Sequence, residues 1–254
     1  MSFKGKAIIV TGATSGIGRA AAEAFAREEA DLVLTGRDAR VLEELARTVK
    51  PPARAILTAV DLADPAAAGH IVNAAVDAFG GVDVLVNCAG IIASGTIEST
   101  TDDEWSRMMA VNLDAPFRLM RAAAPHLAAR KGAVVNVSSV NGLRAFPGLL
   151  AYNVSKAALD HLTRCAALDL APLGVRVNAI NPGVTVTNLH KRSGVDETRY
   201  AAFLERAKET HPLGRPGRPE EVAELILFLS SHRSAWMTGE TIPIDGGRHL
   251  TCLR

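Results

Sequence analysis

The chain has 254 residues, 48% of them hydrophobic, and is long enough to bury the core of one α/β domain spanning residues 1–254. Its formal net charge of +1 gives no field that would favour nucleic acid as a partner. The three cysteines lack the paired spacing of a zinc site or a disulfide framework, and no apolar run approaches the ~20 residues of a membrane span. We expect a cytoplasmic protein with no metal site, no membrane anchor and no nucleic-acid partner.

Short aliphatic runs alternate along the chain with longer helical patterns. Most of these runs are continuous, which is typical of strands covered on both faces of a parallel sheet. The expected strands are Ala7–Thr11, Leu32–Thr35, Ala55–Val60, Val82–Asn87, Ala133–Ser138, Val175–Ile180 and Thr241–Ile244. They predict a doubly wound, Rossmann-type α/β fold with a seven-stranded parallel sheet and helices on both faces.

Helix boundary signals lie between these runs. Asp64-Pro65 predicts a capped helix start with proline at the first helical position, and Thr101–Glu104 reads as a capping box. Pro51-Pro52 is expected to close the helix that begins near Asp38, and Gly80-Gly81 the one that begins at Pro65.

Residues 184–218 form the one long interruption of the alternating pattern. A short helical pattern around 197–208 lies there between turn-rich flanks. An insertion of this length after the carboxyl end of a strand is a candidate substrate lid.

A glycine-rich turn follows the first expected strand in the sequence VTGATSGIGRA. Glycines let the backbone approach a phosphate closely, and the helix that follows offers unpaired N–H groups at its positive end. The strand-to-helix context favours dinucleotide binding over a structural turn. The turn residues expected to contact the cofactor are Gly12, Thr14, Ser15, Gly16, Ile17 and Gly18.

The second expected strand leads into Arg37 and Asp38, about 20 residues beyond the glycines. An arginine here can pair with the 2′-phosphate of NADP, whereas an acidic residue would bind the ribose 2′-hydroxyl of NAD. Arg37 is nearer the strand, so NADP(H) is favoured and NAD(H) stays possible. Asp38 has a second interpretation, as the cap of the next helix.

Asp61 and Asn87 follow the next two expected strands. Alone, either residue would most simply bond its own backbone at a turn. Because the carboxyl ends of parallel strands meet at one edge of the sheet, we expect both side chains to line the same crevice.

The motifs TGATSGIG, NCAG, NVSSVNG, YNVSK and NPGVTVT occur in this order. With them the chain resembles the short-chain dehydrogenase/reductase family over essentially its whole length. The resemblance implies an active-site tetrad, and cofactor contacts beyond the glycine turn. The implied tetrad is Asn112, Ser139, Tyr152 and Lys156; the implied contacts are Asp61, Leu62, Asn87, Ala89, Gly90, Tyr152, Lys156, Pro182, Gly183, Thr185 and Thr187. Cys88 departs from the common NNAG pattern, at a position that can face the core.

The spacing of Tyr152 and Lys156 has its own chemical logic. A free phenol has a pKa near ~10 and is a poor acid near neutral pH. A lysine four residues later lies on the same helix face and can lower the phenol pKa. We therefore assign Tyr152 as general acid in reduction and general base in oxidation. Pro116 cannot donate to the carbonyl of Asn112, which would leave that carbonyl free for a water relay or simply bend the helix.

The substrate is expected to be an apolar ketone or secondary alcohol. Aliphatic and aromatic residues are available in the insertion and after Ser139, namely Leu143, Phe146, Leu149, Leu189, Val195, Tyr200, Phe203 and Leu204, whereas no basic cluster is evident. Carrier-protein-linked 3-oxoacyl reductases share the family, and Arg130 is a plausible docking residue for a carrier.

Three functions remain open on this sequence. An NADPH-linked ketone reductase is favoured, an NAD-linked alcohol dehydrogenase of hydroxysteroid type is the first alternative, and a cofactor-binding regulator without turnover is the second. The family resemblance also implies a homo-oligomer, a dimer or a tetramer.

Overall fold

A computed structural model describes residues 2–187, 189 and 196–251. Seven parallel strands form one sheet in the order β3-β2-β1-β4-β5-β6-β7, which confirms the expected fold. Since the strand order reverses direction between β1 and β4, a crevice opens at that point, beyond the carboxyl ends of the strands. The strands are β1 (Ala7–Thr11), β2 (Asp31–Gly36), β3 (Ala55–Ala59), β4 (Val84–Asn87), β5 (Ala133–Val137), β6 (Arg176–Pro182) and β7 (Thr241–Ile244).

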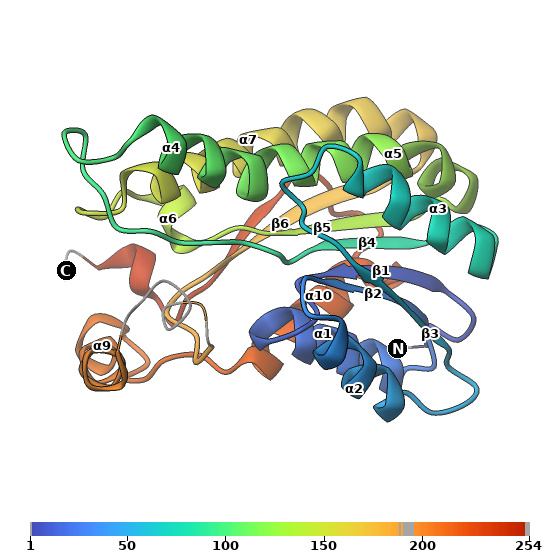
Figure 1. The fold of residues 1–254 in the computed structure, drawn as a ribbon, viewed down its shortest axis with the longest axis horizontal. Coiled ribbons are helices and arrows are strands. Elements are labelled where there is room, and N and C mark those ends of the chain that lie inside the picture. Colours follow the sequence, from blue (N-terminus) through green and yellow to red (C-terminus); the bar gives the residue numbers. More distant parts are fainter. Residues whose placement is uncertain (1, 188, 190–195, 252–254) are drawn as a thin grey trace.

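Helices cover both faces of the sheet (Figure 1). One face carries α3, α5 and α7, and the other carries α1, α2 and α10, each with its own cluster of buried aliphatic side chains. Since β1 is buried along its whole length between the layers, its AIIVT sequence has no polar face. The helices are α1 (Gly16–Arg27), α2 (Ala39–Thr48), α3 (Ala67–Phe79), α4 (Asp102–Met109), α5 (Ala115–Arg130), α6 (Val140–Leu143), α7 (Leu150–Leu170), α9 (Glu197–Thr210) and α10 (Pro219–Ser230).

The helix boundaries agree with the sequence except at α3. The capping box of Thr101 and Glu104 is present, and Gly80 ends α3 with a φ of 74°. The predicted start at Asp64-Pro65 is wrong, because α3 begins only at Ala67. The Asp64 carboxylate instead accepts from the backbone N–H of Ala66 at 2.9 Å, which closes a separate turn before the helix.

A π-helical segment, Ala110–Asp114, joins α4 to α5. The N–H of Ala115 donates to the carbonyl of Ala110, five residues earlier, and Pro116 has no N–H with which to restore the regular pattern. The proline therefore widens one helical turn, and Asn112 lies at its centre.

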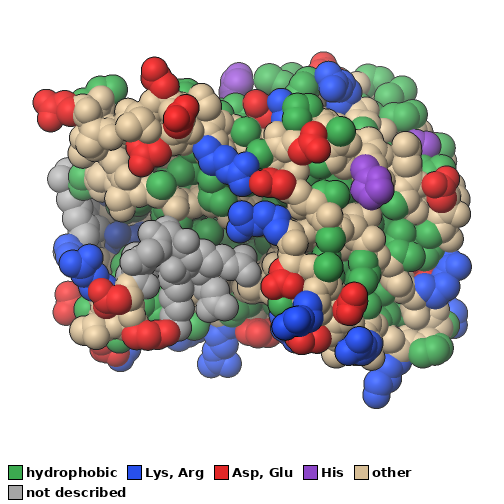
Figure 2. Space-filling model, viewed as in Figure 1, with side chains coloured by type: hydrophobic (Ala, Val, Ile, Leu, Met, Phe, Trp, Pro, Cys, Tyr) green, Lys and Arg blue, Asp and Glu red, His purple; other side chains and the backbone are tan. Residues whose placement is uncertain are grey.

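The insertion at 184–218 is closed at its base. Val186 N–H donates to the carbonyl of Gly217 at 3.0 Å, and Gly217 N–H donates to the carbonyl of Val184 at 2.8 Å. Helix α9 extends from this base and stands apart from the two helical layers (Figure 1). Figure 2 shows acidic and basic side chains interspersed over this face of the molecule.

Candidate active site

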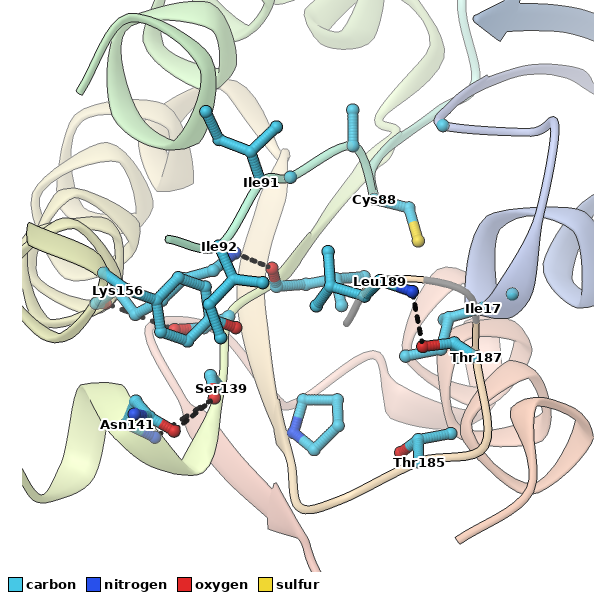
Figure 3. A pocket seen from close by; sticks show the side chains of 18 of the residues that line it. Ile17, Cys88, Ile91, Ile92, Ser139, Asn141, Lys156, Thr185, Thr187 and Leu189 are labelled. Atoms are coloured by element: carbon cyan, nitrogen blue, oxygen red, sulfur yellow. Dashed lines mark hydrogen bonds between the residues drawn. The ribbon is translucent and has the colours of Figure 1, made fainter. Parts of the chain in front are cut away.

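A pocket of about 510 Å³ lies beyond the carboxyl ends of the strands, within the size range of small-molecule sites. It is lined by every expected site residue except Asn87 and Asn112. The predicted residues that line it are Gly12, Thr14, Ser15, Gly16, Ile17, Gly18, Arg37, Asp61, Leu62, Ala89, Gly90, Ser139, Tyr152, Lys156, Pro182, Gly183, Thr185 and Thr187. Figure 3 shows Ser139, Asn141 and Lys156 on one side of the pocket and Ile17, Cys88 and Thr187 on the other.

The glycine turn is shaped by close backbone approaches. Gly12 has a φ of 69°, and a Cβ there would lie 2.9 Å from the Cα of Ala89. A Cβ on Gly18 would clash with the carbonyl oxygen of Gly12. No acidic residue lies in the first turn of α1, so the positive end of that helix is open to an anion. These features fit the pyrophosphate of a dinucleotide.

Arg37 and Asp38 differ in what their side chains do. The Asp38 carboxylate caps α2 by accepting from the N–H of Val41 at 3.2 Å, and Asp38 is not among the pocket residues. Arg37 lines the pocket, is exposed and makes no hydrogen bond or salt bridge with another described residue. Of these two residues, Arg37 is therefore the one whose side chain can bind a phosphate.

Asp61 lies beside two arginines at the same end of the pocket. Arg107, on α4, donates to its carboxylate at 2.8 Å. The backbone N–H of Ala63 lowers the pKa of Asp61 most, and the positive charges of Arg107 and Arg37 add to this effect. Asp61 is thus a carboxylate at neutral pH, and Arg107 is a pocket residue that the sequence had not indicated.

Asn87 is placed inside the sheet rather than in the pocket. Its amide donates to the side-chain oxygen of Asn136 at 2.8 Å, and Asn136 in turn donates to Thr163 at 2.9 Å. Thr11 joins the two strand ends instead, because its hydroxyl accepts from the N–H groups of Cys88 and Ala89. Cys88 packs against the core as expected and also lines the pocket.

Tyr152 and Lys156 are buried on α7, which begins just before them. The Lys156 ammonium lies 5.8 Å from the centre of the Tyr152 ring and donates to the carbonyl of Val137 at 2.9 Å. Burial lowers the pKa of Lys156 to about 8, although Cys88 and Asp160 oppose this. Lys156 can therefore gain or lose a proton close to neutral pH.

Burial raises the pKa of Tyr152, and its hydrogen bond with Ser139 lowers it only in part. The phenol is consequently protonated at neutral pH, the form needed by a proton donor. The expected lowering of the Tyr152 pKa by Lys156 stays a prediction.

Asn112 lies next to the pocket wall and is fully buried. Its side-chain oxygen accepts from the N–H of Ile91 at 2.9 Å, and its amide nitrogen donates to the Ile91 carbonyl at 2.9 Å and to Ser155 at 3.1 Å. The side chain therefore holds the segment after β4 against α7, and Ile91 itself lines the pocket.

The hydroxyl of Ser139 belongs to a chain of amides. The carbonyl of Phe146 can only accept, so the Asn153 amide nitrogen faces it at 2.7 Å and the Asn153 oxygen faces the amide nitrogen of Asn141 at 2.7 Å. The Asn141 oxygen is then left to face Ser139, and the Ser139 O–H donates to it at 3.1 Å (Figure 3). Ser139 Oγ also accepts from the backbone N–H of Asn141 at 3.1 Å.

Comparisons with known proteins agree with this geometry. The family model described as enoyl-(acyl carrier protein) reductase matches residues 12–249. A meso-2,3-butanediol dehydrogenase of Serratia marcescens is 36% identical over 247 residues, which are 97% of this chain and 96% of the relative. The chain belongs to the short-chain dehydrogenase/reductase family.

Two further similar proteins are described together with a cofactor. An NADP-dependent (R)-specific alcohol dehydrogenase of Lentilactobacillus kefiri is 36% identical over 96% of this chain and 97% of the relative. The crystal structure of L-sorbose reductase from Gluconobacter frateurii, complexed with NADPH and L-sorbose, has a TM-score of 0.92 and 34% identity, covering 99% of both chains. This short-chain dehydrogenase/reductase is thus an NAD(P)-dependent oxidoreductase that acts on CH–OH or carbonyl groups.

The substrate end of the pocket is only partly the apolar surface that the sequence suggested. Phe146, Leu149, Leu189 and Phe203 line it, whereas Leu143, Tyr200 and Leu204 do not and Val195 lies outside the described residues. Ile91 and Ile92 add to the apolar wall.

Two arginines, Arg206 on α9 and Arg248 after β7, also line the pocket of this short-chain dehydrogenase/reductase. Sequence reasoning missed them because they are 42 positions apart and belong to no motif. Arg130, considered above as a carrier-docking residue, ends α5 just before β5 begins and donates to the carbonyl of Gly80 at 3.2 Å. It is therefore at the opposite edge of the sheet from the pocket.

Proposed function

We propose that the protein is an NADPH-linked reductase of ketones that also oxidises the corresponding secondary alcohols. The observation that carries the proposal is the meeting of Ser139, Tyr152 and Lys156 at one end of a pocket whose other end is the glycine turn. A cofactor-binding regulator would need the turn but has no use for a buried phenol beside a lysine.

The residues divide the chemistry between them. A bound reduced nicotinamide supplies the hydride that forms the new C–H bond. The carbonyl oxygen takes its proton from the Tyr152 hydroxyl, and the product is the alcohol; oxidation reverses each transfer. Lys156, with a pKa of about 8, can return a proton to Tyr152 near neutral pH. Asn112, in the π-helical turn, is proposed to hold a water that connects Lys156 to solvent.

The preference for NADPH rests on the second strand end. Arg37 faces the pocket, while the carboxylate of Asp38 is engaged as the cap of α2. A guanidinium pairs with a phosphate through parallel hydrogen bonds, so Arg37 is proposed to hold the 2′-phosphate. Thr14 and Ser15 line the same pocket, and their hydroxyls can donate further hydrogen bonds.

The catalytic assignment is tested with Tyr152→Phe. A panel of ketones and secondary alcohols is assayed with both cofactors, and cofactor binding is measured by fluorescence. General acid catalysis is worth about 100- to 10,000-fold, and we expect turnover to fall by that factor while NADPH still binds. Full turnover in Tyr152→Phe would sink the mechanism. Tight NADPH binding with no turnover in the parent protein across the panel would favour a regulator.

The cofactor assignment is tested with Arg37→Ala, and Arg40→Ala is the matched control. Arg40 is exposed on α2 and is not a pocket residue. Loss of a charge-assisted hydrogen bond is expected to weaken NADPH binding by about 10- to 100-fold, with NADH binding little changed. Equal losses for the two cofactors, or the same loss in Arg40→Ala, would contradict the assignment of Arg37 to the 2′-phosphate.

Three further points accompany the proposal. Residues 184–218 are proposed to act as a substrate lid, since α9 contributes Phe203 and Arg206 to the pocket. A homo-oligomer is proposed because Phe117 on α5 and Leu168 on α7 are 44% and 77% exposed.

No helix within the described part of the chain is long and apolar enough to cross a membrane. A cytoplasmic location stays a prediction.

A further inference from the structure

The backbone at Ser139 lies just beyond the end of the pairing between β5 and β6. The N–H of Ser138 donates to the carbonyl of Ile180 on β6 at 2.8 Å. In a regular parallel ladder, the next bond would come from the N–H of residue 182 on β6, and Pro182 has none. The sheet therefore stops holding the chain where Ser139 begins the turn into α6, and the position of Ser139 depends on other groups.

The side chain of Asn181 is one of these groups. Asn181 lies on β6 and is fully buried. A carbonyl can only accept, so the amide nitrogen of Asn181 faces the Ser139 carbonyl at 2.9 Å and donates to it. The second hydrogen of the same nitrogen goes to Oδ2 of Asp160 at 2.8 Å. Asn181 thus connects the backbone of Ser139 on one side to a carboxylate on the other.

That carboxylate belongs to the helix of the reactive residues. Asp160 lies on α7, four residues beyond Lys156 and eight beyond Tyr152, and only 2% of it is exposed. Helix α6 packs directly over the carboxylate, since a Cβ on Gly142 would clash with its Oδ2. Asp160 therefore ties the backbone of Ser139 to the helix that carries the other two reactive side chains.

Two buried oxygens of this cluster have no hydrogen-bond donor. They are Oδ1 of Asp160 and Oδ1 of Asn181, and none of the residues that the structure describes donates to either. A buried acceptor without a donor weakens a fold, and a cluster that served stability alone would pair both atoms. Stability alone therefore does not account for a carboxylate at this position.

We infer that Asp160 and Asn181 are positioning residues, which hold the Ser139 backbone against α7. The Ser139 hydroxyl is thereby kept in place at the reactive end of the pocket. The inference rests on the proposed function, in which Ser139 binds the substrate oxygen that Tyr152 protonates. Neither positioning residue lines the pocket, so each acts through Ser139 and not on the substrate. Their role differs from that of Asn141, which orients the hydroxyl itself.

Asn181→Ala and Asn178→Ala form a matched pair for the test. Both asparagines are fully buried on β6, but Asn178 donates to the carbonyl of Met237 and accepts from the N–H of Glu240, neither of which lines the pocket. Because a small displacement of a reactive group is costly, we expect Asn181→Ala to lower kcat by about 10- to 100-fold, with NADPH affinity unchanged. Asn178→Ala should lose a similar amount of stability and keep kcat within about 2-fold of the parent.

The acidic partner is tested by exchanging the carboxylate. Asp160→Ala leaves the Asn181 amide free to turn, and kcat should fall by about 3- to 10-fold. Asp160→Asn keeps an oxygen that accepts from Asn181 and should restore kcat to within about 2-fold of the parent. Asp169→Ala, at an exposed position of the same helix, should have no effect. Since the charge of Asp160 also acts on the pKa of Lys156, kcat is taken at the plateau of each pH profile.

Amide hydrogen exchange gives a readout that does not depend on turnover. Residues 139–143 should exchange faster in Asn181→Ala than in the parent, and no faster in Asn178→Ala. Urea unfolding identifies any variant that fails to fold. If Asn181→Ala is one, the contrast between Asp160→Ala and Asp160→Asn decides.

The inference fails, and the proposed function stands, if Tyr152→Phe loses turnover while Asn181→Ala keeps it. Equal losses of kcat in Asn181→Ala and Asn178→Ala also overturn the inference, because they would show a general effect of destabilising β6. If Tyr152→Phe keeps full turnover, the proposed function fails, and the positioning role fails with it.

Discussion

The two ends of the pocket are built in different ways. The cofactor end is made largely of backbone from one short stretch, in which Gly12 and Gly18 contact each other closely and Gly12 also meets Ala89. The substrate end is made of side chains from separate segments, with Phe146 after α6, Arg206 on α9 and Arg248 after β7. A backbone site leaves a compact motif in the sequence, whereas a site assembled from distant side chains leaves none.

The largest effect in this comparison is expected at the cofactor end, which is built from backbone. In Gly18→Ala, the added Cβ would clash with the carbonyl oxygen of Gly12, a backbone atom that cannot turn away. We expect a loss of about 1–3 kcal/mol in unfolding free energy and of about 100-fold in NADPH affinity. Urea unfolding measures the change in unfolding free energy, and fluorescence titration measures the change in NADPH affinity.

Gly69→Ala is the control for that variant. Gly69 lies in α3, and a Cβ there meets nothing within 4 Å. Alanine is the better helix former by roughly 0.5–1 kcal/mol, so Gly69→Ala should raise stability and leave cofactor affinity unchanged. If Gly18→Ala bound NADPH as tightly as Gly69→Ala, close packing would not be what shapes the cofactor end.

The same difference explains what the sequence could predict. Continuous aliphatic runs identified all seven strands, most clearly where a strand such as Ala7–Thr11 is buried along its whole length and has no polar face. Local signals predicted helix ends correctly where one residue makes a capping hydrogen bond with a residue close to it in the chain, as at Thr101 and Gly80. Asp64-Pro65 misled because a capped turn and a capped helix begin with the same residues.

The candidate site divides along the same line. Motif residues of the glycine turn and of α7 line the pocket, because their roles depend on spacing within one segment. The family resemblance also predicted Asn87 and Asn112 as site residues, yet their side chains form hydrogen bonds within the protein. Asn87 bonds with Asn136 on the neighbouring strand, and Asn112 bonds with Ile91 after β4. Arg107, Arg206 and Arg248 reach the pocket only through tertiary packing, which no local pattern reports.

A smaller effect is expected within the reactive end. The side-chain oxygen of Asn141 accepts the Ser139 O–H and thereby orients the hydroxyl that influences the pKa of Tyr152. Asn141→Ala should lower kcat by about 10-fold, the value of one such hydrogen bond, with cofactor affinity unchanged. Steady-state kinetics and cofactor titration separate these two quantities.

Asn153→Ala lies one hydrogen bond further along the same chain and should lower kcat by only about 3-fold. This graded order identifies a positioning role for Asn141, since a general loss of packing would have no reason to follow the sequence of hydrogen bonds. An unchanged kcat in Asn141→Ala would show that Ser139 finds its orientation without help.

The smallest effect concerns how the first residue of the insertion is held to the end of α9. His211, at the end of α9, accepts from the N–H of Val184 through Nε2 at 3.1 Å, and its Nδ1 lies 2.8 Å from the carbonyl of Ala207. The ring therefore joins Val184 to α9 as a neutral imidazole protonated on Nδ1. Burial lowers the pKa of His211 most, and the charge of Arg248 lowers it further, whereas Ala207 and Asp245 oppose the shift.

Since the folded-state pKa of His211 lies below its usual value of 6.5, the unfolded chain binds this proton first as the pH falls. The stability that His211 contributes is complete above about pH 6.5 and is lost as the pH falls through the folded-state pKa. Between about pH 7.5 and about pH 5.5, the parent should lose on the order of 1 kcal/mol more unfolding free energy than His211→Gln, which has no ring to protonate. His70→Gln, at an exposed position on α3, should lose as much as the parent. Urea unfolding at the two pH values decides the matter, and equal losses in the parent and His211→Gln would mean that another group responds to acid at this junction.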